Sequence, residues 1–180
     1  MADEYASILE ECGGISRREA YVHEFSAHKE AWLDVWALGI PETPDLLLDI
    51  TVRNPVADRY RSSAAKGEAV AAAHAEQEKF DRYPAAGGRQ VWPVAYEVYG
   101  RAGEQAEQLL ELLAAAARRR AHRRGKAAGQ ELQRWRARLD AVLQRAVAAQ
   151  VLSARVGLPG RRLFRRKPLD ITAIEAAALV

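Results

Sequence analysis

Two short apolar runs, separated by a connection that contains glycine and proline, stand out in the pattern of hydrophobic positions. Residues 32–38 (WLDVWAL) and residues 46–53 (LLLDITVR) are rich in aromatic and branched side chains. Such runs, bounded by turn-forming residues, are typical of β-strands. The pattern therefore predicts a β-hairpin over residues 31–55.

One acidic residue interrupts each of these apolar strands. Period-two alternation places Asp34 on the same face as Trp32 and Trp36, and Asp49 on the same face as Thr51. If the two faces coincide, the carboxylates project side by side from neighbouring strands, which is the arrangement that a hard cation such as Mg²⁺ requires. The alternative is that each acid lies at a sheet edge or faces solvent.

Helices and further strands are expected on either side of the hairpin. Apolar spacing predicts helices over residues 3–12, 68–83, 104–120 and 129–154, and β-rich stretches predict strands over residues 19–25 and 90–99, with loop or frayed helix over residues 56–67. Pro93 lacks a backbone donor, so its strand is expected at an edge or a bulge. The chain is predicted to be an α/β protein.

The helix predicted over residues 68–83 carries a stripe of residues spaced by four, three and four positions. Ala72, Glu76, Lys79 and Tyr83 share one side of that helix. Lys79 is therefore expected to point the same way as Glu76 and Tyr83. An ordinary cluster of surface side chains would have the same spacing.

Charge is distributed unevenly along the chain. Residues 1–90 hold 10 Lys or Arg against 16 Asp or Glu, a net of −6, whereas residues 91–180 hold 17 against 8, a net of +9. A basic half suggests a polyanionic partner, most simply nucleic acid, although solvated arginine-rich helix faces would give the same count. The candidate nucleic-acid contacts are Arg118, Arg119, Arg120, Arg123, Arg124, Lys126, Arg161, Arg162, Arg165, Arg166 and Lys167.

Composition and hydropathy exclude several classes of protein and of binding site. A single cysteine, Cys12, excludes an internal disulfide framework and a cysteine-based zinc site, and it favours a reducing compartment. The sequence has no apolar run long enough to span a membrane and no Gly-rich phosphate loop. We expect an intracellular protein without a membrane partner, nuclear if the source is eukaryotic.

The expected order of helix, three strands, helix and strand, with an acid on each of two adjacent strands, resembles the PD-(D/E)XK nuclease superfamily. The run LLLDITV, followed by a helix bearing Lys79 and Tyr83, is similar to the restriction-enzyme-like endonuclease of non-LTR retrotransposons. In that group a lysine on the following helix is thought to replace the lysine of the strand. The resemblance covers residues 19–100 and implies a restriction-endonuclease-like α-β-β-β-α-β core with a mixed sheet, followed by C-terminal helices.

The resemblance also implies roles for particular residues. Asp34 and Asp49 stand where the family has its two metal-binding acids, and Lys79 stands as the migrated catalytic lysine. Thr51 occupies the place of the strand lysine. Glu76 and Tyr83 would position Lys79. The sequence departs from the pattern at Leu33, where the family has proline, and at Thr51.

The implied function is a metal-dependent DNA endonuclease domain, of mobile-element origin, that hydrolyses phosphodiester bonds with Mg²⁺ or Mn²⁺. Two alternatives stay open, a catalytically inactive nucleic-acid-binding protein that keeps the fold and a helical protein-interaction module. The nuclease-like core is expected over residues 1–122, and a basic helical extension with a tail over residues 123–180.

Overall fold

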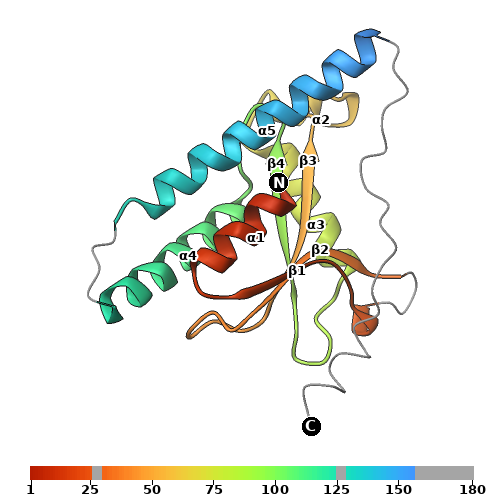
Figure 1. Ribbon diagram of the computed structural model, residues 1–180. Coiled ribbons are helices and arrows are strands. Elements are labelled where there is room, and N and C mark those ends of the chain that lie inside the picture. Colours follow the sequence, from red (N-terminus) through yellow and green to blue (C-terminus); the bar gives the residue numbers. More distant parts are fainter. Residues whose placement is uncertain (26–29, 125–128, 157–180) are drawn as a thin grey trace.

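A four-stranded mixed sheet forms the centre of the molecule. The computed structural model describes residues 1–25, 30–124 and 129–156, and Figure 1 shows how the elements are arranged. The strands are β1 (Ile15–Tyr21), β2 (Trp32–Leu38), β3 (Leu46–Arg53) and β4 (Val91–Glu97), in the spatial order β1-β2-β3-β4. β1 and β2 pair antiparallel, as do β2 and β3, whereas β3 and β4 are parallel. The predicted α/β class is confirmed.

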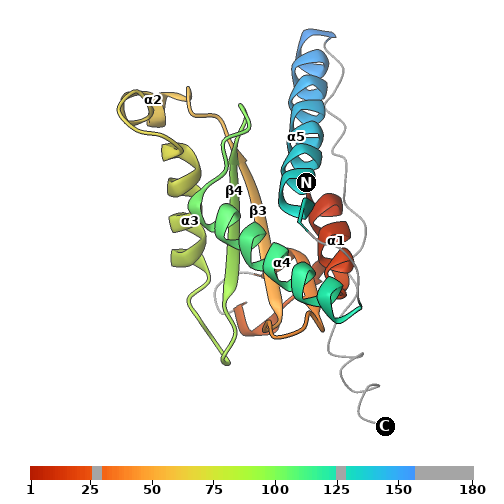
Figure 2. The ribbon, with the colours of Figure 1, turned by 90° about the vertical axis from the view of Figure 1, so that its left-hand side faces the viewer.

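Helices cover both faces of this sheet. They are α1 (Ala2–Glu11), α2 (Asp58–Ala64), α3 (Val70–Arg82), α4 (Glu104–Arg123) and α5 (Glu131–Val156), with a short 3₁₀ turn η1 (His23–Phe25) between β1 and β2. Figure 2 shows α3 on one side of β3 and β4, and α1, α4 and α5 on the other. The parallel pair β3 and β4 needs a crossover connection, which α2 and α3 supply.

The hairpin strands have the predicted bounds, but the prediction of the first strand is wrong. That strand was expected over residues 19–25, whereas β1 is Ile15–Tyr21 and η1 follows it. β1 is an edge strand with a polar sequence, because its residues face α1 through ionic and hydrogen-bonded contacts. Arg18 forms an ion pair with Asp3, and Ser16 donates a hydrogen bond to Glu10 at 2.7 Å. The hydrophobic pattern of β1 is therefore weak. The expected turn over residues 26–29 lies outside the described residues.

Pro93 lies in the last strand, β4, and has no backbone N–H to donate to the sheet. The sequence predicted an edge strand or a bulge here for that reason, and β4 is an edge strand, in which Pro93 pairs in register with Asp49 of β3.

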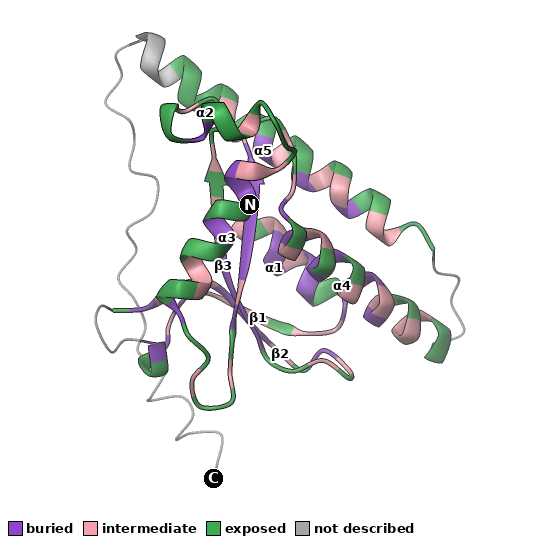
Figure 3. Ribbon diagram, turned by 180° about the vertical axis from the view of Figure 1, so that it is seen from behind, coloured by how far each residue is buried: buried purple, intermediate pink, exposed green. Residues whose placement is uncertain are grey.

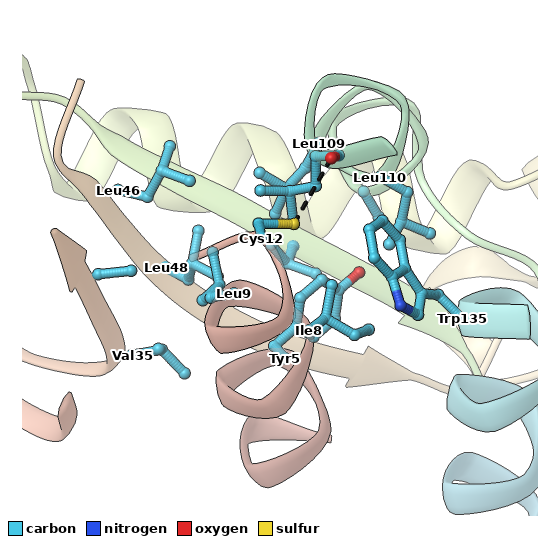
Figure 4. Packing of buried hydrophobic residues seen from close by; sticks show 14 of the residues in the cluster. Tyr5, Ile8, Leu9, Cys12, Val35, Leu46, Leu48, Leu109, Leu110 and Trp135 are labelled. Carbon is cyan, nitrogen blue, oxygen red and sulfur yellow. Dashed lines mark hydrogen bonds between the residues drawn. The ribbon is translucent and has the colours of Figure 1, made fainter. Parts of the chain in front are cut away.

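The main core lies between the sheet and the helices α1, α4 and α5 (Figure 4). Its fully buried side chains include Tyr5, Ile8, Leu9, Leu48, Leu109, Leu110, Leu113 and Trp135. The hydroxyl groups of Tyr5 and Tyr96 share a hydrogen bond of 2.7 Å, which joins α1 to β4. Trp135 anchors α5 in this core, so the predicted basic helical extension packs directly on the rest of the fold.

The other face of the sheet receives α3 through small side chains. Ala72 and Ala75 of α3 pack on Ala95 of β4, and all three are buried. Such small residues allow the helix to lie close to the strands. Helix α3 is exposed on its outer side, and much of α5 is exposed as well (Figure 3).

Two buried glutamates bind the first turns of helices, one of α3 and one of α4. Glu97 at the end of β4 accepts a hydrogen bond from the backbone N–H of Ala71 at 3.0 Å, in the first turn of α3. Glu76 of α3 accepts one from the backbone N–H of Gln105 at 3.1 Å, in the first turn of α4. A carboxylate at a helix N-terminus satisfies a free N–H group and interacts favourably with the helix dipole. These two contacts hold α3 in place over the sheet.

Replacing Glu97 by Ala is expected to lower the free energy of unfolding by about 1–3 kcal/mol, since it leaves the buried N–H of Ala71 without a partner. Chemical denaturation measures the change. Glu111→Ala, at an exposed position of α4, is the control and is expected to change the free energy by less than about 0.5 kcal/mol. Equal effects of the two substitutions would contradict this role of Glu97.

Candidate metal-binding site

Strands β2 and β3 bring the two predicted acids face to face. Val35 pairs with Leu48 and Trp36 with Leu47, so the same register continued by one residue places Asp34 opposite Asp49. Asp34 Oδ2 accepts a hydrogen bond of 2.6 Å from the backbone N–H of Ile50. The Asp34 carboxylate thus accepts a backbone hydrogen bond just beyond the last paired residues of the two strands.

Helix α3 supplies a cation to this pair of acids. Lys79 Nζ lies 2.8 Å from Asp49 Oδ2, and the two side chains are 16% and 9% exposed. Asp49 is a buried residue of β3, while α3 crosses between β3 and β4 directly above it. Lys79 therefore lies against one of the two predicted acids, Asp49. A nearly buried pair of this kind interacts more strongly than a surface ion pair, because water screens it less.

Tyr83 completes the group at the end of α3. Burial raises the pKa of Tyr83 to about 12, and the negative charge of Asp49 together with a hydrogen bond to it adds to the shift. The Tyr83 ring also packs edge-on against Phe25, with ring centroids 6.1 Å apart. Tyr83 is therefore neutral at physiological pH and restrains Asp49 as well as the end of the helix.

The two carboxylates raise the proton affinity of the site. Burial raises the pKa of Asp34 to about 6, and the charge of Asp49 contributes in the same direction, against the lowering effects of the Ile50 hydrogen bond and Lys79. Burial, more than the neighbouring charge, makes ionisation of Asp34 unfavourable. A divalent cation bound between the two acids would favour the ionised form.

Asp34→Asn is expected to stabilise the metal-free protein at pH 8. Because the folded-state pKa of Asp34 is raised, its stabilising contribution is complete below about pH 4 and is lost as the pH rises through about 6. Removing the charge is expected to raise the free energy of unfolding by about 1–3 kcal/mol at pH 8 and to have little effect near pH 4. Thermal unfolding in EDTA at both pH values measures this.

Asp58→Asn, at an exposed acid of α2, is the matched control and is expected to show no such pH dependence. A melting temperature of Asp34→Asn below that of the wild type at pH 8 would show that the ionised Asp34 carboxylate does not destabilise the folded protein.

The remaining predicted site residues lie in different surroundings. Thr51 follows two residues after Asp49 in β3 and is half-buried. Glu76 binds the first turn of α4 and is thereby directed away from Lys79. Burial raises the pKa of Glu76, while backbone hydrogen bonds from Gln105, Ala106 and Ala95 act against the shift. Glu76 thus fixes the position of α3, and its effect on Lys79 is transmitted through the helix.

The basic cluster of α4 does not lie beside the two acids. Leu48 and Val94 face the core under α4, whereas their neighbours Asp49 and Ala95 face α3, so the two helices cover opposite faces of the sheet. Arg119 and Arg123 form ion pairs with Glu42 at 3.2 and 3.1 Å. The predicted contacts Lys126, Arg161, Arg162, Arg165, Arg166 and Lys167 lie outside the described residues.

A third acid near the site was not identified from the sequence. The β1–β2 register pairs Arg18 with Val35 and Ala20 with Leu33, which places Glu19 opposite Asp34. Glu19 has a φ of 50°, an uncommon conformation for a residue with a side chain, and its charge helps to raise the pKa of Asp34. The misplaced first strand concealed this register, and the long connection between β1 and β2 leaves it open in the sequence.

Within residues 1–25, 30–124 and 129–156, no three His, Cys, Asp or Glu side chains converge closely enough to hold a metal ion together. Asp34, Asp49 and the backbone carbonyl near Ile50 are the candidate ligands. Their oxygen chemistry suits Mg²⁺ or Mn²⁺, which retain several waters when bound by one or two carboxylates.

Comparisons with models of protein families, with curated proteins and with solved structures found no match to this chain. In the described residues, no helix is long and apolar enough to cross a membrane.

Proposed function

We propose that the chain is a metal-dependent DNA endonuclease domain with a restriction-endonuclease-like fold. The observation that carries the proposal is the meeting of Asp34, Asp49 and Lys79 at one point of the sheet, with the lysine amine 2.8 Å from an Asp49 oxygen. Two carboxylates and one lysine beside the point where two strands part are suited to binding a metal ion and a phosphate together. They come from two strands and a helix, and only the fold brings them together.

The order of elements supports the same proposal. An N-terminal helix, three antiparallel strands, the helical crossover α2 and α3, and a parallel fourth strand follow one another along the chain, which is compatible with the order that the PD-(D/E)XK resemblance implies. The acids lie on the second and third strands, and the lysine lies on α3, the second helix of the crossover. Lys79 in this proposal replaces a lysine at the position of Thr51.

The residues of the chain have separable tasks in this proposal. A divalent cation, when bound, lowers the pKa of a water molecule and offsets the charge that develops on the phosphate. Asp34 and Asp49 would hold the cation, and the Ile50 hydrogen bond orients the Asp34 carboxylate. Lys79 Nζ, which donates a hydrogen bond to Asp49 in this structure, would donate one to a phosphate oxygen or to the attacking water, and Tyr83 would restrain Asp49.

A second candidate function is nucleic-acid binding without cleavage. The observation that favours it is the ion pair between Lys79 and Asp49, because a cation that binds Asp49 must compete with the lysine. In that case the pair would serve as a structural contact between β3 and α3.

Incubation of the wild-type protein with supercoiled and single-stranded circular DNA distinguishes the two functions. The nuclease proposal predicts nicking with Mg²⁺ or Mn²⁺ and none in EDTA. Binding of both DNA forms, without cleavage in either metal, would refute the nuclease proposal and support the binding function.

A further inference from the structure

A separate pocket lies between α1, α4 and α5, on the side of the sheet opposite Lys79. Its volume is about 660 Å³, within the range of small-molecule sites. Four arginines line it, together with Glu11 and Glu131: Arg120 of α4, Arg124 at the C-cap of that helix, and Arg134 and Arg138 of α5. The pocket lining therefore carries two more positive than negative charges.

Glu11, one of the acids that line the pocket, already accepts hydrogen bonds from three side chains. Glu11 accepts hydrogen bonds from Arg134 at 2.5 Å, from Trp135 Nε1 at 2.8 Å and from Arg138. Burial acts to raise the pKa of Glu11, but the hydrogen bonds from Arg138 and Trp135 outweigh it, so the net pKa is lowered. Glu11 is therefore ionised and held, and it fixes the two arginines of α5 around itself.

The two arginines of α4 have no such partner. Arg120 and Arg124 are one helical turn apart and face the same pocket. Within the described part of the chain, neither forms an ion pair with an acidic side chain. Two neighbouring guanidinium groups that form no ion pair repel each other, and a bound anion would relieve that repulsion.

The backbone of α1 is shaped to receive Arg120. Gly13, directly after the helix, has a φ of 97°, and a Cβ atom at this position would overlap the Arg120 guanidinium. The arginine head group thus lies against bare backbone at the end of α1, half-buried at the wall of the pocket. This contact restricts the side chain before any ligand binds, which lowers the entropic cost of binding.

We propose that this pocket binds closely spaced phosphate groups, either those of a nucleic-acid backbone or those of a free polyphosphate. Guanidinium groups match phosphate geometry through paired N–H donors, and those of Arg120 and Arg124 line the pocket without forming an ion pair in the described part of the chain. The sheet separates the pocket from Asp34 and Asp49, so the phosphates bound here are different from any phosphate at that site. The proposal is independent of the nuclease activity.

Calorimetric titration of the full chain in EDTA tests the proposal with two probes, inorganic triphosphate and a 12-base-pair DNA duplex. The wild type is expected to bind triphosphate with one site per chain. The variant Arg120→Gln/Arg124→Gln is expected to bind it at least about tenfold more weakly. Arg145→Gln, an exposed arginine of α5 outside the pocket, is the matched control and is expected to stay within about twofold of the wild type.

The two probes distinguish the sources of phosphate. If the pocket variant also weakens duplex binding and triphosphate displaces the duplex, the pocket holds a nucleic-acid backbone. If duplex binding is unchanged, the pocket is specific for a free polyphosphate. The exposed Arg124→Gln alone repeats the test should the double variant fold poorly. Absence of triphosphate binding at millimolar concentration, or an equal loss in Arg145→Gln, would overturn the proposal.

Discussion

Asp49→Asn is expected to reduce metal-dependent DNA cleavage by about a hundredfold or more, which is the scale of losing one charge-stabilising group at a reaction centre. Asp49 is 7% exposed, contacts Lys79 at 2.8 Å and lies opposite Asp34. Its replacement by the isosteric amide removes the negative charge that a cation needs and leaves the shape of the site unchanged. The initial rate of nicking of a supercoiled plasmid in Mn²⁺ measures the effect.

Asp45→Asn is the matched control for this substitution. Asp45 lies just before β3, four residues earlier, and its carboxylate is 37% exposed and 3.7 Å from Arg89. The same chemical change is expected to leave the nicking rate within about twofold. A fall of similar size in both variants would show that general loss of charge, and no specific site, controls cleavage.

Lys79→Met is expected to reduce the cleavage rate by about 10²- to 10³-fold while the affinity for Mn²⁺ stays the same or rises. The loss follows because the amine is the donor placed beside the metal-binding acids. The gain in affinity follows because Lys79 competes with a metal ion for Asp49 Oδ2. Single-turnover cleavage and calorimetric titration of Mn²⁺ measure the two quantities separately.

Lys66→Met, at an exposed lysine between α2 and α3, is the control for the loss of a positive charge and is expected to alter neither quantity. Weaker Mn²⁺ binding by Lys79→Met would contradict the assigned geometry. Unchanged cleavage would remove Lys79 from the catalytic group and leave it as a structural partner of Asp49.

The sequence predicted the part of the fold in which local pattern and tertiary environment agree. The strands of the hairpin are apolar because β2 and β3 are central in the sheet, so their bounds follow from composition alone. β1 is an edge strand whose polar side chains contact α1, and its position depends on contacts such as Arg18 with Asp3 that no local pattern encodes.

The candidate site was predicted as far as helical spacing and strand alternation extend. They place Lys79 and Tyr83 on one stripe and the two acids on their strands. The direction of Glu76 could not be predicted, because it depends on where the first turn of α4 lies, and its partner Gln105 is 29 residues further along the chain. The position of Glu19 opposite Asp34 likewise follows from strand register, which the sequence leaves open when an edge strand is misplaced.

The pocket between α1, α4 and α5 arises entirely from tertiary structure. Its arginines appear in the sequence as members of a basic run, and nothing in that run separates Arg120 from Arg119. The fold does so, because Arg119 pairs with Glu42 while Arg120 lies against Gly13.

The central claim is that Asp34 and Asp49 hold one divalent cation, and cleavage of the protein backbone by bound Fe²⁺ tests it most directly. Fe²⁺ substituted for Mg²⁺ generates hydroxyl radicals with ascorbate and peroxide, and these cut the chain close to the metal. The account predicts cuts around residues 34 and 49 that excess Mg²⁺ suppresses and that Asp49→Asn abolishes. Cuts elsewhere, or no cuts that Mg²⁺ suppresses, would contradict it.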